Sequence, residues 1–268
     1  MSKATVIAAF YNKIDYLRLV LAGFERQSEK DFEFIVADDG SKPEIVKELE
    51  ILSKEIPFQL IHIWQEDKGF RKNKILNKAI ATANSNYIIF IDADCIPHSR
   101  FVEEHISYSE KGSCITGRRV NLSQKYTQIL TPEKVRDGLI EKNNFALIKD
   151  GLFGESFYVE KGFYFKSRVL RKIFNKKERG LLGCNFSLHK EDMLNINGFD
   201  ERYEAPSIGE DSDVQYRLEL NGIKIVSLNH IAVQYHLYHH LLERPQENLA
   251  LFNKIKEEKL PFTPFGIK

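Results

Sequence analysis

Short apolar runs alternate with amphipathic stretches over the first hundred residues. Four runs are apolar at most of their successive positions, at residues 5–10, 32–37, 58–64 and 87–91. Between them, apolar residues recur at spacings of three and four, which predicts helices over residues 16–24, 45–52 and 74–83. Strands that are apolar on both faces and are separated by helices indicate a mostly parallel sheet flanked by helices, in the α/β class.

The alternation weakens after about residue 115. Residues 120–180 mix polar, basic and aromatic side chains without a clear strand and helix rhythm. Regularity returns at 181–188, followed by a predicted helix over 214–220 and strands at 224–226 and 231–235. We therefore predict one continuous domain in two halves, residues 1–118 and 119–268, with a variable insert at about 120–180.

The predicted strands of the first half end in polar residues. Asn12 follows the first strand, Asp38 and Asp39 follow the second, and Asp92 and Asp94 follow the fourth. Ligands of parallel sheets bind beyond the carboxyl ends of the strands. These side chains should therefore meet at one edge of the sheet.

Each of the two aspartate pairs has a functional and a structural interpretation. Two carboxylates at positions i and i+2, as in Asp92 and Asp94, can jointly hold a divalent cation that bridges the oxygens of a diphosphate. The alternative is a helix cap and a solvated carboxylate, but the position directly after an apolar run favours the metal. Asp38 and Asp39 either form a turn or present a carboxylate to the imide N–H of a uracil ring, and the pattern leaves both open.

A second acidic cluster lies in the second half. Glu210, Asp211 and Asp213 fall at a predicted helix start, where negative charge is favourable and capping explains at least one of them. Adjacent carboxylates raise one another's pKa, which suits a general base. The cluster therefore predicts acid–base chemistry.

Three histidines follow the last predicted strand. The spacing of His236 to His239 or His240 is compatible with metal binding, but no Cys or Glu lies nearby, which argues against a closed zinc site. His236 can instead serve as a single late ligand of an ion held mainly by the aspartates.

Composition excludes several classes of protein. Hydrophobic residues make up 43% and charged residues 29% of 268, as in soluble globular proteins. The net charge of +1 gives no argument for a nucleic-acid partner. The 3 cysteines form neither a disulfide framework nor a CxxC site, which fits a reducing compartment. Because neither a signal-peptide segment nor an 18-residue apolar run is present, we expect a cytoplasmic chain.

Taken together, these segments resemble the family 2 glycosyltransferases, whose GT-A fold contains a Rossmann-like nucleotide-binding sheet. The resemblance covers about residues 3–118 and 180–237, and its second part is similar to galactosyl- and N-acetylgalactosaminyltransferases and to chondroitin-polymerase-like enzymes. The matching segments are 8–12 (Ala-Ala-Phe-Tyr-Asn), 36–41 (Val-Ala-Asp-Asp-Gly-Ser), 68–71 (Lys-Gly-Phe-Arg), 77–80 (Asn-Lys-Ala-Ile), 92–97 (Asp-Ala-Asp-Cys-Ile-Pro), 197–201 (Asn-Gly-Phe-Asp-Glu) and 210–213 (Glu-Asp-Ser-Asp).

The resemblance implies that the first half binds the nucleotide of a UDP-sugar, with Phe10 and Asp39 on uracil. The implied nucleotide-binding residues are Ala9, Phe10, Asp38, Asp39, Arg71, Asn77, Asp92 and Ala93. Many members carry an Arg-Asn pair where this chain has Leu76-Asn77, so another cation must neutralise the diphosphate. The candidates for that cation are Arg71, Lys72 and Lys74.

The resemblance also implies a metal site and a catalytic base. The implied metal ligands are Asp92, Asp94 and His236, holding Mn²⁺ by preference and Mg²⁺ as the second choice. Asp211 is expected to act as the base and Glu210 to contact the acceptor sugar, which leaves Asp213 to cap the helix.

The predicted function is inverting, metal-dependent transfer of galactose, N-acetylgalactosamine or a related sugar to a hydroxyl of a glycan or lipid-linked glycan. One alternative is a sugar-phosphate nucleotidyltransferase, but its glycine-rich basic loop is missing after the first strand. The other is a non-catalytic carbohydrate-binding protein, which the intact aspartates argue against.

One segment lies outside the resemblance. Residues 161–179 contain eight basic residues against one acidic, with Val169, Leu170, Ile173 and Phe174 at helical spacing. Such a helix can lie on an anionic membrane, here the inner face of the cytoplasmic membrane. An ordinary exposed helix that covers the core is the simpler interpretation.

Overall fold

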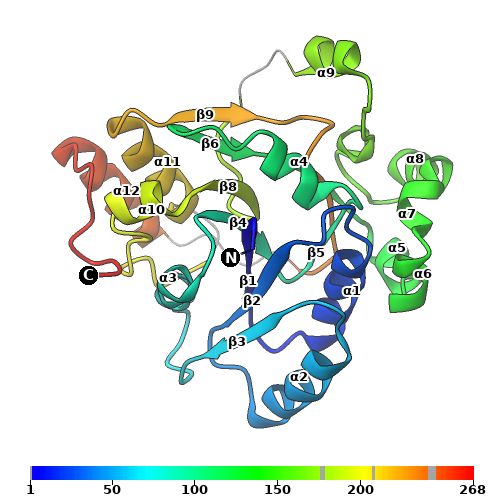
Figure 1. The fold of residues 1–268 in the computed structure, drawn as a ribbon, viewed down its shortest axis with the longest axis horizontal. Coiled ribbons are helices and arrows are strands. Elements are labelled where there is room, and N and C mark those ends of the chain that lie inside the picture. The colour runs from blue at the N-terminus through cyan, green and yellow to red at the C-terminus, as the bar shows by residue number, and fades with distance from the viewer. Residues whose placement is uncertain (1, 176–178, 207–208, 241–245) are drawn as a thin grey trace.

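A seven-stranded sheet forms the centre of the computed structural model, which describes residues 2–175, 179–206, 209–240 and 246–268 (Figure 1). In spatial order its strands are β3 (Leu60–Trp64), β2 (Phe32–Asp38), β1 (Ala4–Phe10), β4 (Tyr87–Asp92), β8 (Asn185–His189), β6 (Ser113–Thr116) and β9 (Lys224–Ser227). The first four are parallel, β8 is antiparallel to both neighbours, and β6 and β9 are parallel. The predicted mostly parallel sheet is confirmed.

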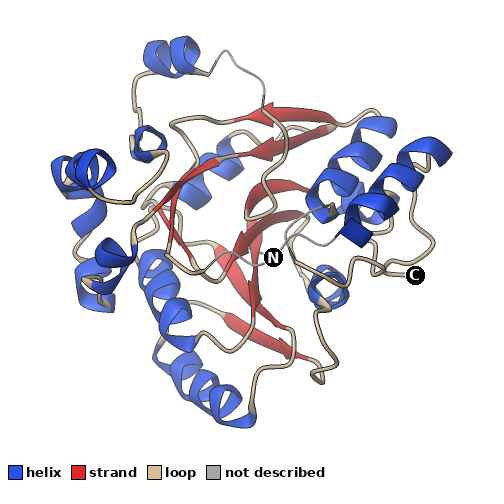
Figure 2. Ribbon diagram, turned by 180° about the vertical axis from the view of Figure 1, so that it is seen from behind, coloured by secondary structure: helices blue, strands red, loops and turns tan. Residues whose placement is uncertain are grey.

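Helices cover both faces of this sheet (Figures 1 and 2). Val6 and Ala8 of β1 pack in the core that contains α1 and α2, whereas Ile7 packs in the core that contains α3 and α11. This two-sided burial explains why the strand is apolar at successive positions. The helices are α1 (Ile14–Glu25), α2 (Pro43–Glu55), α3 (Lys72–Thr82), α4 (Phe101–Ser107), α10 (Lys190–Asn195), α11 (Glu210–Leu220) and α12 (Gln246–Glu258).

A smaller sheet joins the two halves of the chain. It has the order β5 (Cys95–Pro97), β10 (Val233–His236) and β7 (Arg118–Asn121), of which the sequence predicts only the strand ending at His236. In the antiparallel register His236 faces Cys95, and the Leu237 N–H donates to the Asp94 carbonyl at 2.8 Å. The last strand therefore holds the backbone directly after β4.

The variable insert consists of short helices rather than irregular chain. They are α5 (Gln124–Gln128), α6 (Pro132–Arg136), α7 (Leu139–Lys142), α8 (Asn144–Phe153), the 3₁₀ turn η1 (Val159–Gly162) and α9 (Arg168–Phe174). None of the residues of α9 is buried, so it does not cover the core as the simpler interpretation of 161–179 requires. Residues 176–178 of that segment lie outside the described residues.

Among the residues that the structure describes, no helix combines the length and the apolar character that crossing a bilayer requires.

Candidate active site

A cavity of about 550 Å³ lies at the carboxyl ends of the parallel strands β1, β2 and β4. This is the edge at which the polar strand ends were predicted to meet. Six of the predicted nucleotide and metal residues line it: Ala9, Phe10, Asp39, Asp92, Ala93 and Asp94. Its other walls come from residues 67–75 and from His239 and His240.

Backbone hydrogen bonds beyond the strands fix the three strand ends to one another. The Asp39 N–H donates to the Phe10 carbonyl at 3.0 Å, and the Ala93 N–H donates to the Ala9 carbonyl at 3.0 Å. The end of the central strand β1 therefore positions the turns after both β2 and β4. Gly40 follows Asp39 with a φ of 96°, a conformation that glycine adopts without steric cost.

The two aspartates after β2 have different roles. Asp38 is fully buried, and its carboxylate accepts from the Ser41 N–H at 2.8 Å and lies 3.0 Å from His62 Nε2. It therefore stabilises the turn and does not line the cavity. Asp39 lines the cavity and accepts from Gln65 Nε2 at 2.6 Å and from the Arg71 N–H at 2.7 Å.

Burial raises the pKa of Asp39, and the hydrogen bonds from Gln65 and Arg71 only partly oppose this effect. The carboxylate therefore stands at the cavity wall with donors already on both oxygens. A hydrogen-bond donor on a bound nucleobase would have to share these oxygens with Gln65 and Arg71.

Asp94 lies beside two imidazoles. Its Oδ2 is 3.3 Å from His239 Nε2 and 3.6 Å from His236 Nε2. Asp94, Cys95 and His236 offer ligand atoms that all lie within 4.8 Å of one another. The Asp94 oxygen and the His236 nitrogen, with the His239 nitrogen also against the same carboxylate, are donors that suit a divalent transition metal.

The two histidines of this cluster differ in protonation, because the hydrogen bond with Asp94 raises the pKa of His239 whereas burial lowers that of His236. Burial lowers the pKa of His236 to about 4, so that its ring is neutral at neutral pH and a nitrogen lone pair is free to bind. Burial acts to raise the pKa of Asp94, but His239 and His236 outweigh it and keep that pKa below its ordinary value. His239 was named in the sequence only by its spacing, and the structure places it as close to Asp94 as His236.

Of the three candidate cations, Lys72 is the one that lines the cavity. Its Nζ donates to Asp92 Oδ1 at 2.9 Å. Burial acts to lower the pKa of Lys72, but the Asp92 and Glu210 carboxylates raise it overall, so the side chain is charged. The other two candidates point elsewhere, because Arg71 Nη2 donates to the Glu66 carbonyl and Lys74 Nζ lies 4.0 Å from Glu201.

The acidic cluster at the start of α11 divides into separate roles. Asp213 is fully buried, and its Oδ2 accepts from Arg217 Nε at 3.0 Å. It does not cap the helix, so that expectation is wrong. The reason is that Arg217, one turn further on, supplies a buried partner, and the N-cap position is occupied by Gly209 without any side-chain cap.

Asp211 and Glu210 point away from that buried pair. Asp211 Oδ1 accepts from the Ser212 N–H at 2.8 Å, and its Oδ2 lies 3.4 Å from the Gly183 N–H. Burial raises the pKa of Glu210, Lys72 opposes this effect and Asp211 adds to it. Glu210 thus interacts electrostatically with the lysine that borders the cavity.

Asn77 has a structural role at a distance from the cavity wall. Its amide donates to the Phe199 carbonyl at 2.9 Å and accepts from the Phe199 N–H at 2.8 Å. This pair of bonds ties α3 to the turn before α11. The structure therefore does not bring Asn77 to the nucleotide cavity.

Sequence reasoning did not find Arg119, which lies behind the aspartates. Its Nη1 donates to Cys184 Sγ at 3.1 Å, while Cys95 Sγ lies 3.4 Å from Asp94 Oδ1. Arg119 belongs to the four-residue strand β7, and no periodic pattern marks so short an element.

Comparisons with known proteins identify the family of this chain. The sequence matches the family described as "Glycosyl transferase family 2" over residues 5–174, and the one described as "N-terminal domain of galactosyltransferase" over residues 168–240. It is 26% identical over 254 residues to chondroitin synthase of Escherichia coli, covering 87% of this chain and 34% of the relative. An uncharacterized glycosyltransferase of Methanocaldococcus jannaschii is 27% identical over 176 residues, which cover 63% of this chain and 57% of the relative. The chain thus spans only a third to just over half of these relatives.

Solved structures show the same fold. Staphylococcus aureus TarS residues 1–349, in complex with UDP-GlcNAc, superposes with a TM-score of 0.61 at 17% identity, covering 96% of this chain and 66% of that one. The mannosyltransferase PcManGT of Pyrobaculum calidifontis, in complex with GDP-Man and Mn²⁺, superposes with a TM-score of 0.57 at 14% sequence identity. The match covers 94% of this chain and 61% of that one. The predicted GT-A fold is confirmed.

Proposed function

Because the chain belongs to glycosyl transferase family 2, whose members use sugar-nucleotide donors, we propose that its strand-end cavity binds a UDP-sugar and a divalent cation. The observation that carries the proposal is the convergence of Asp39, Asp92 and Asp94 on one cavity, with His236 and His239 against the last of them. UDP-GlcNAc is bound by TarS, and GDP-Man with Mn²⁺ by PcManGT. Membership of a transferase family favours this chemistry over the nucleotidyltransferase and the non-catalytic alternatives.

In this proposal the base and the diphosphate bind at opposite ends of the cavity. Uracil lies against Phe10 and Asp39, and Lys72 contacts the diphosphate in place of the missing arginine. Asp94, His236 and His239 would hold the cation, and Asp92 lies on the cation or on the ribose. When bound, the cation stabilises the charge that develops on the departing UDP. Its imidazole ligands favour Mn²⁺ over Mg²⁺, which prefers oxygen.

The catalytic residues of the proposal come from α11. Asp211 removes the proton of an acceptor hydroxyl while that oxygen forms its bond to the anomeric carbon, and the bond from the same carbon to UDP breaks. One displacement of this kind inverts the anomeric configuration. Glu210 contacts the acceptor sugar.

The donor sugar and the acceptor are proposed from the similar proteins. Galactose, N-acetylgalactosamine or a related sugar is the donor, because residues 168–240 match a galactosyltransferase family and because chondroitin synthase is a relative. The acceptor is a hydroxyl of a glycan or of a lipid-linked glycan. The three cysteines are free and buried, which supports a reducing, cytoplasmic compartment.

The experiment is a nucleoside-diphosphate-release assay, which detects UDP and GDP alike, with a panel of UDP-sugars and GDP-mannose, run with Mn²⁺, Mg²⁺ or chelator. We expect release from UDP-galactose or UDP-N-acetylgalactosamine with Mn²⁺ and loss of release after chelation. Release from GDP-mannose alone, or full activity in chelator, would contradict the proposal.

A further inference from the structure

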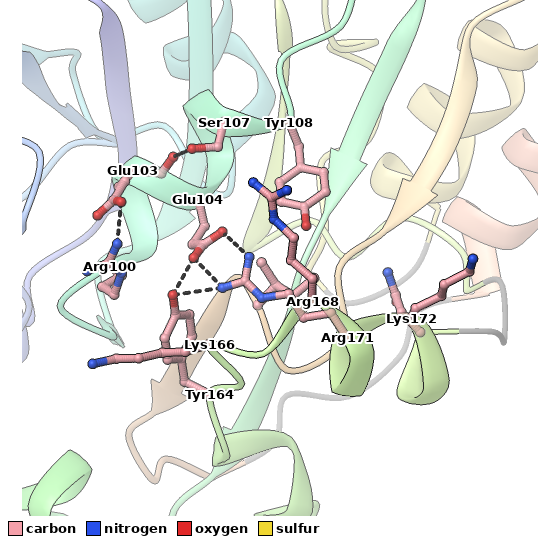
Figure 3. Close-up of a pocket in the computed structure, with 12 residues that line it drawn as sticks. Arg100, Glu103, Glu104, Ser107, Tyr108, Tyr164, Lys166, Arg168, Arg171 and Lys172 are labelled. Atoms are coloured by element: carbon pink, nitrogen blue, oxygen red, sulfur yellow. Dashed lines mark hydrogen bonds and ion pairs between the residues drawn. The ribbon is translucent and has the colours of Figure 1, made fainter.

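A second cavity, of about 860 Å³, lies between α4 and the segment that leads into α9 (Figure 3). It shares no lining residue with the strand-end cavity that is proposed to bind the UDP-sugar, called the donor cavity from here on. Its lining carries five cationic side chains against two carboxylates. The charged residues that line it are Arg100, Glu103, Glu104, Lys166, Arg168, Arg171 and Lys172.

Only part of this positive charge is neutralised within the protein. Arg171 Nη1 donates to Glu104 Oε2 at 2.9 Å, and Arg100 pairs with Glu103 (Figure 3). Among the residues that the structure describes, Lys166, Arg168 and Lys172 have no acidic side chain within ion-pair distance. The cavity therefore presents three uncompensated cations to a ligand.

The helix beside the cavity is amphipathic in an unusual sense, because its apolar face is the exposed one. At 100° per residue, Arg168, Arg171 and Lys172 share one arc, and the four apolar residues fill an arc of roughly 140° on the other side. The cationic arc lines the cavity. The exposed fractions of the apolar side chains are 67% for Val169, 40% for Leu170, 50% for Ile173 and 52% for Phe174.

This helix is held firmly in its orientation. Arg171 Nε donates to the Phe165 carbonyl at 2.5 Å, and the Phe174 ring lies 5.2 Å from the Phe165 ring. At its end, the Asn229 N–H donates to Asn175 Oδ1 at 3.0 Å. Arg171 and Asn175 thus hold the helix from its cationic side, while Phe174, at one edge of the apolar face, packs against Phe165 and remains 52% exposed.

We propose that α9 rests with its apolar face on an anionic lipid bilayer, and that the adjoining cavity binds the phosphate of a lipid headgroup. Charge complementarity selects this occupant, since three free cations beside four bulky apolar groups match a phosphate layer above acyl chains. A nucleic acid would leave the apolar side chains in water, and a second copy of the chain would have to supply acidic groups. The inference does not depend on the proposed glycosyl transfer.

Vesicle sedimentation tests the docking. The protein should sediment with vesicles of phosphatidylcholine and phosphatidylglycerol, less so as salt is raised, and not with phosphatidylcholine alone. Arg168→Gln with Lys172→Gln should weaken partitioning roughly 30-fold, because each cation near an anionic surface contributes about 1 kcal/mol. Ile173→Ser should weaken it roughly tenfold by removing buried apolar area.

Matched controls are available on α2, at the opposite end of the molecule in both views (Figures 1 and 2). Lys47→Gln with Lys54→Gln makes the same change of charge on exposed lysines, and Ile51→Ser alters an isoleucine that is 60% exposed. Both controls should bind vesicles like the parent protein. Circular dichroism confirms that each variant is folded.

Four results would overturn the proposal. The first is unchanged sedimentation of the Arg168/Lys172 variant, and the second is equal binding to neutral and anionic vesicles. The third is binding of soluble glycerol phosphate that is as tight as binding of anionic vesicles. The fourth is a protein that sediments with no vesicle and forms a dimer that Ile173→Ser dissociates. The third result would assign the cavity to a soluble phosphate, and the fourth would make the α9 face an interface between two copies.

Discussion

The donor cavity and the cavity beside α9 have opposite electrostatic character. The donor cavity is lined by four carboxylates against two lysines, whereas the cavity beside α9 is lined by five cations against two carboxylates. In the two proposals above, a metal ion neutralises the carboxylates when a diphosphate binds the first cavity, whereas a phosphate in the second cavity meets cationic side chains directly. The same class of ligand group would then be bound in two ways within one chain.

The elements that build the cavities account for this difference. Carboxylates of the donor cavity stand on strand ends that are locked by bonds such as Ala93 N–H to the Ala9 carbonyl, so they cannot move apart to relieve repulsion. Three of the five cations of the other cavity stand on one arc of the short helix α9, whose opposite, apolar face is exposed. A rigid edge supports metal-dependent chemistry, and an exposed face supports reversible contact. Each prediction below changes one side of this contrast.

The largest effect is expected at Asp211, the proposed catalytic base on α11. Asp211→Asn keeps the shape of the side chain and removes its basicity, so kcat should fall by roughly 10²- to 10⁴-fold. Steady-state UDP release measures this, with UDP affinity and vesicle binding expected to stay unchanged. Ser212→Ala on the same turn is the control. Near-normal turnover of Asp211→Asn would show that Asp211 is not the catalytic base.

The second-largest effect is expected from a change that destabilises the whole fold and therefore both cavities. Asp213→Ala leaves Arg217 buried without its partner, which should lower the free energy of unfolding by about 3–5 kcal/mol. Urea unfolding measures the loss, and both cavities should disappear at one midpoint. A loss of only about 1 kcal/mol would instead fit the helix cap that the sequence suggested.

Removal of the metal should weaken binding at the donor cavity and leave binding at the cavity beside α9 unchanged. Calorimetry in chelator should show UDP affinity reduced by roughly 10- to 100-fold, because the carboxylates then repel the diphosphate without compensation. Vesicle binding should not change. His236→Ala should reduce the preference for Mn²⁺ over Mg²⁺, and equal UDP affinity with and without chelator would argue against a metal-bridged diphosphate.

The smallest effect concerns α4, which lies between the two regions. Burial lowers the pKa of His105 on α4 to about 3, and its ring lies 3.1 Å from Asn185 Oδ1 of β8. Below pH 6.5 the unfolded chain takes up a proton that the folded chain does not. Stability is therefore complete above pH 6.5 and falls toward pH 3, with a slope of at most about 1.4 kcal/mol per pH unit from this group.

His105→Gln should make that slope shallower between pH 7 and pH 5 while lowering stability at neutral pH. Urea midpoints across this range measure both. An unchanged slope would show that His105 titrates alike in the folded and unfolded chains.

How far the sequence predicts the structure differs between the two regions. The strands at residues 5–10 and 87–91 were predictable because two-sided burial demands continuous apolar runs. The predicted strand at 58–64 is shorter in the structure, where β3 at the sheet edge is only half-buried. Strands β5 and β7 have three and four residues, too few for any periodicity to be visible.

The candidate site shows the same limit. Spacing identified Asp94 and His236, but only the pairing of β10 with β5 shows that His239 also reaches Asp94. The role of Asp213 was misjudged, although an Arg four residues later is a recognisable signal for a pair on one helix face. No sequence pattern could have predicted the cavity beside α9, because α4 and α9 come together only in the folded chain.

One feature of the sheet bears on how this protein is made. Strand β8 lies between β4 and β6, although it is synthesised well after both. A ribosome releases the chain N-terminus first, so the facing edges of β4 and β6 stay unpaired while the whole insert is translated. Unpaired apolar edges recruit other chains into aggregates. The time during which a nascent molecule is exposed to that hazard is thus set by the translation of the insert, not by the stability of the finished fold.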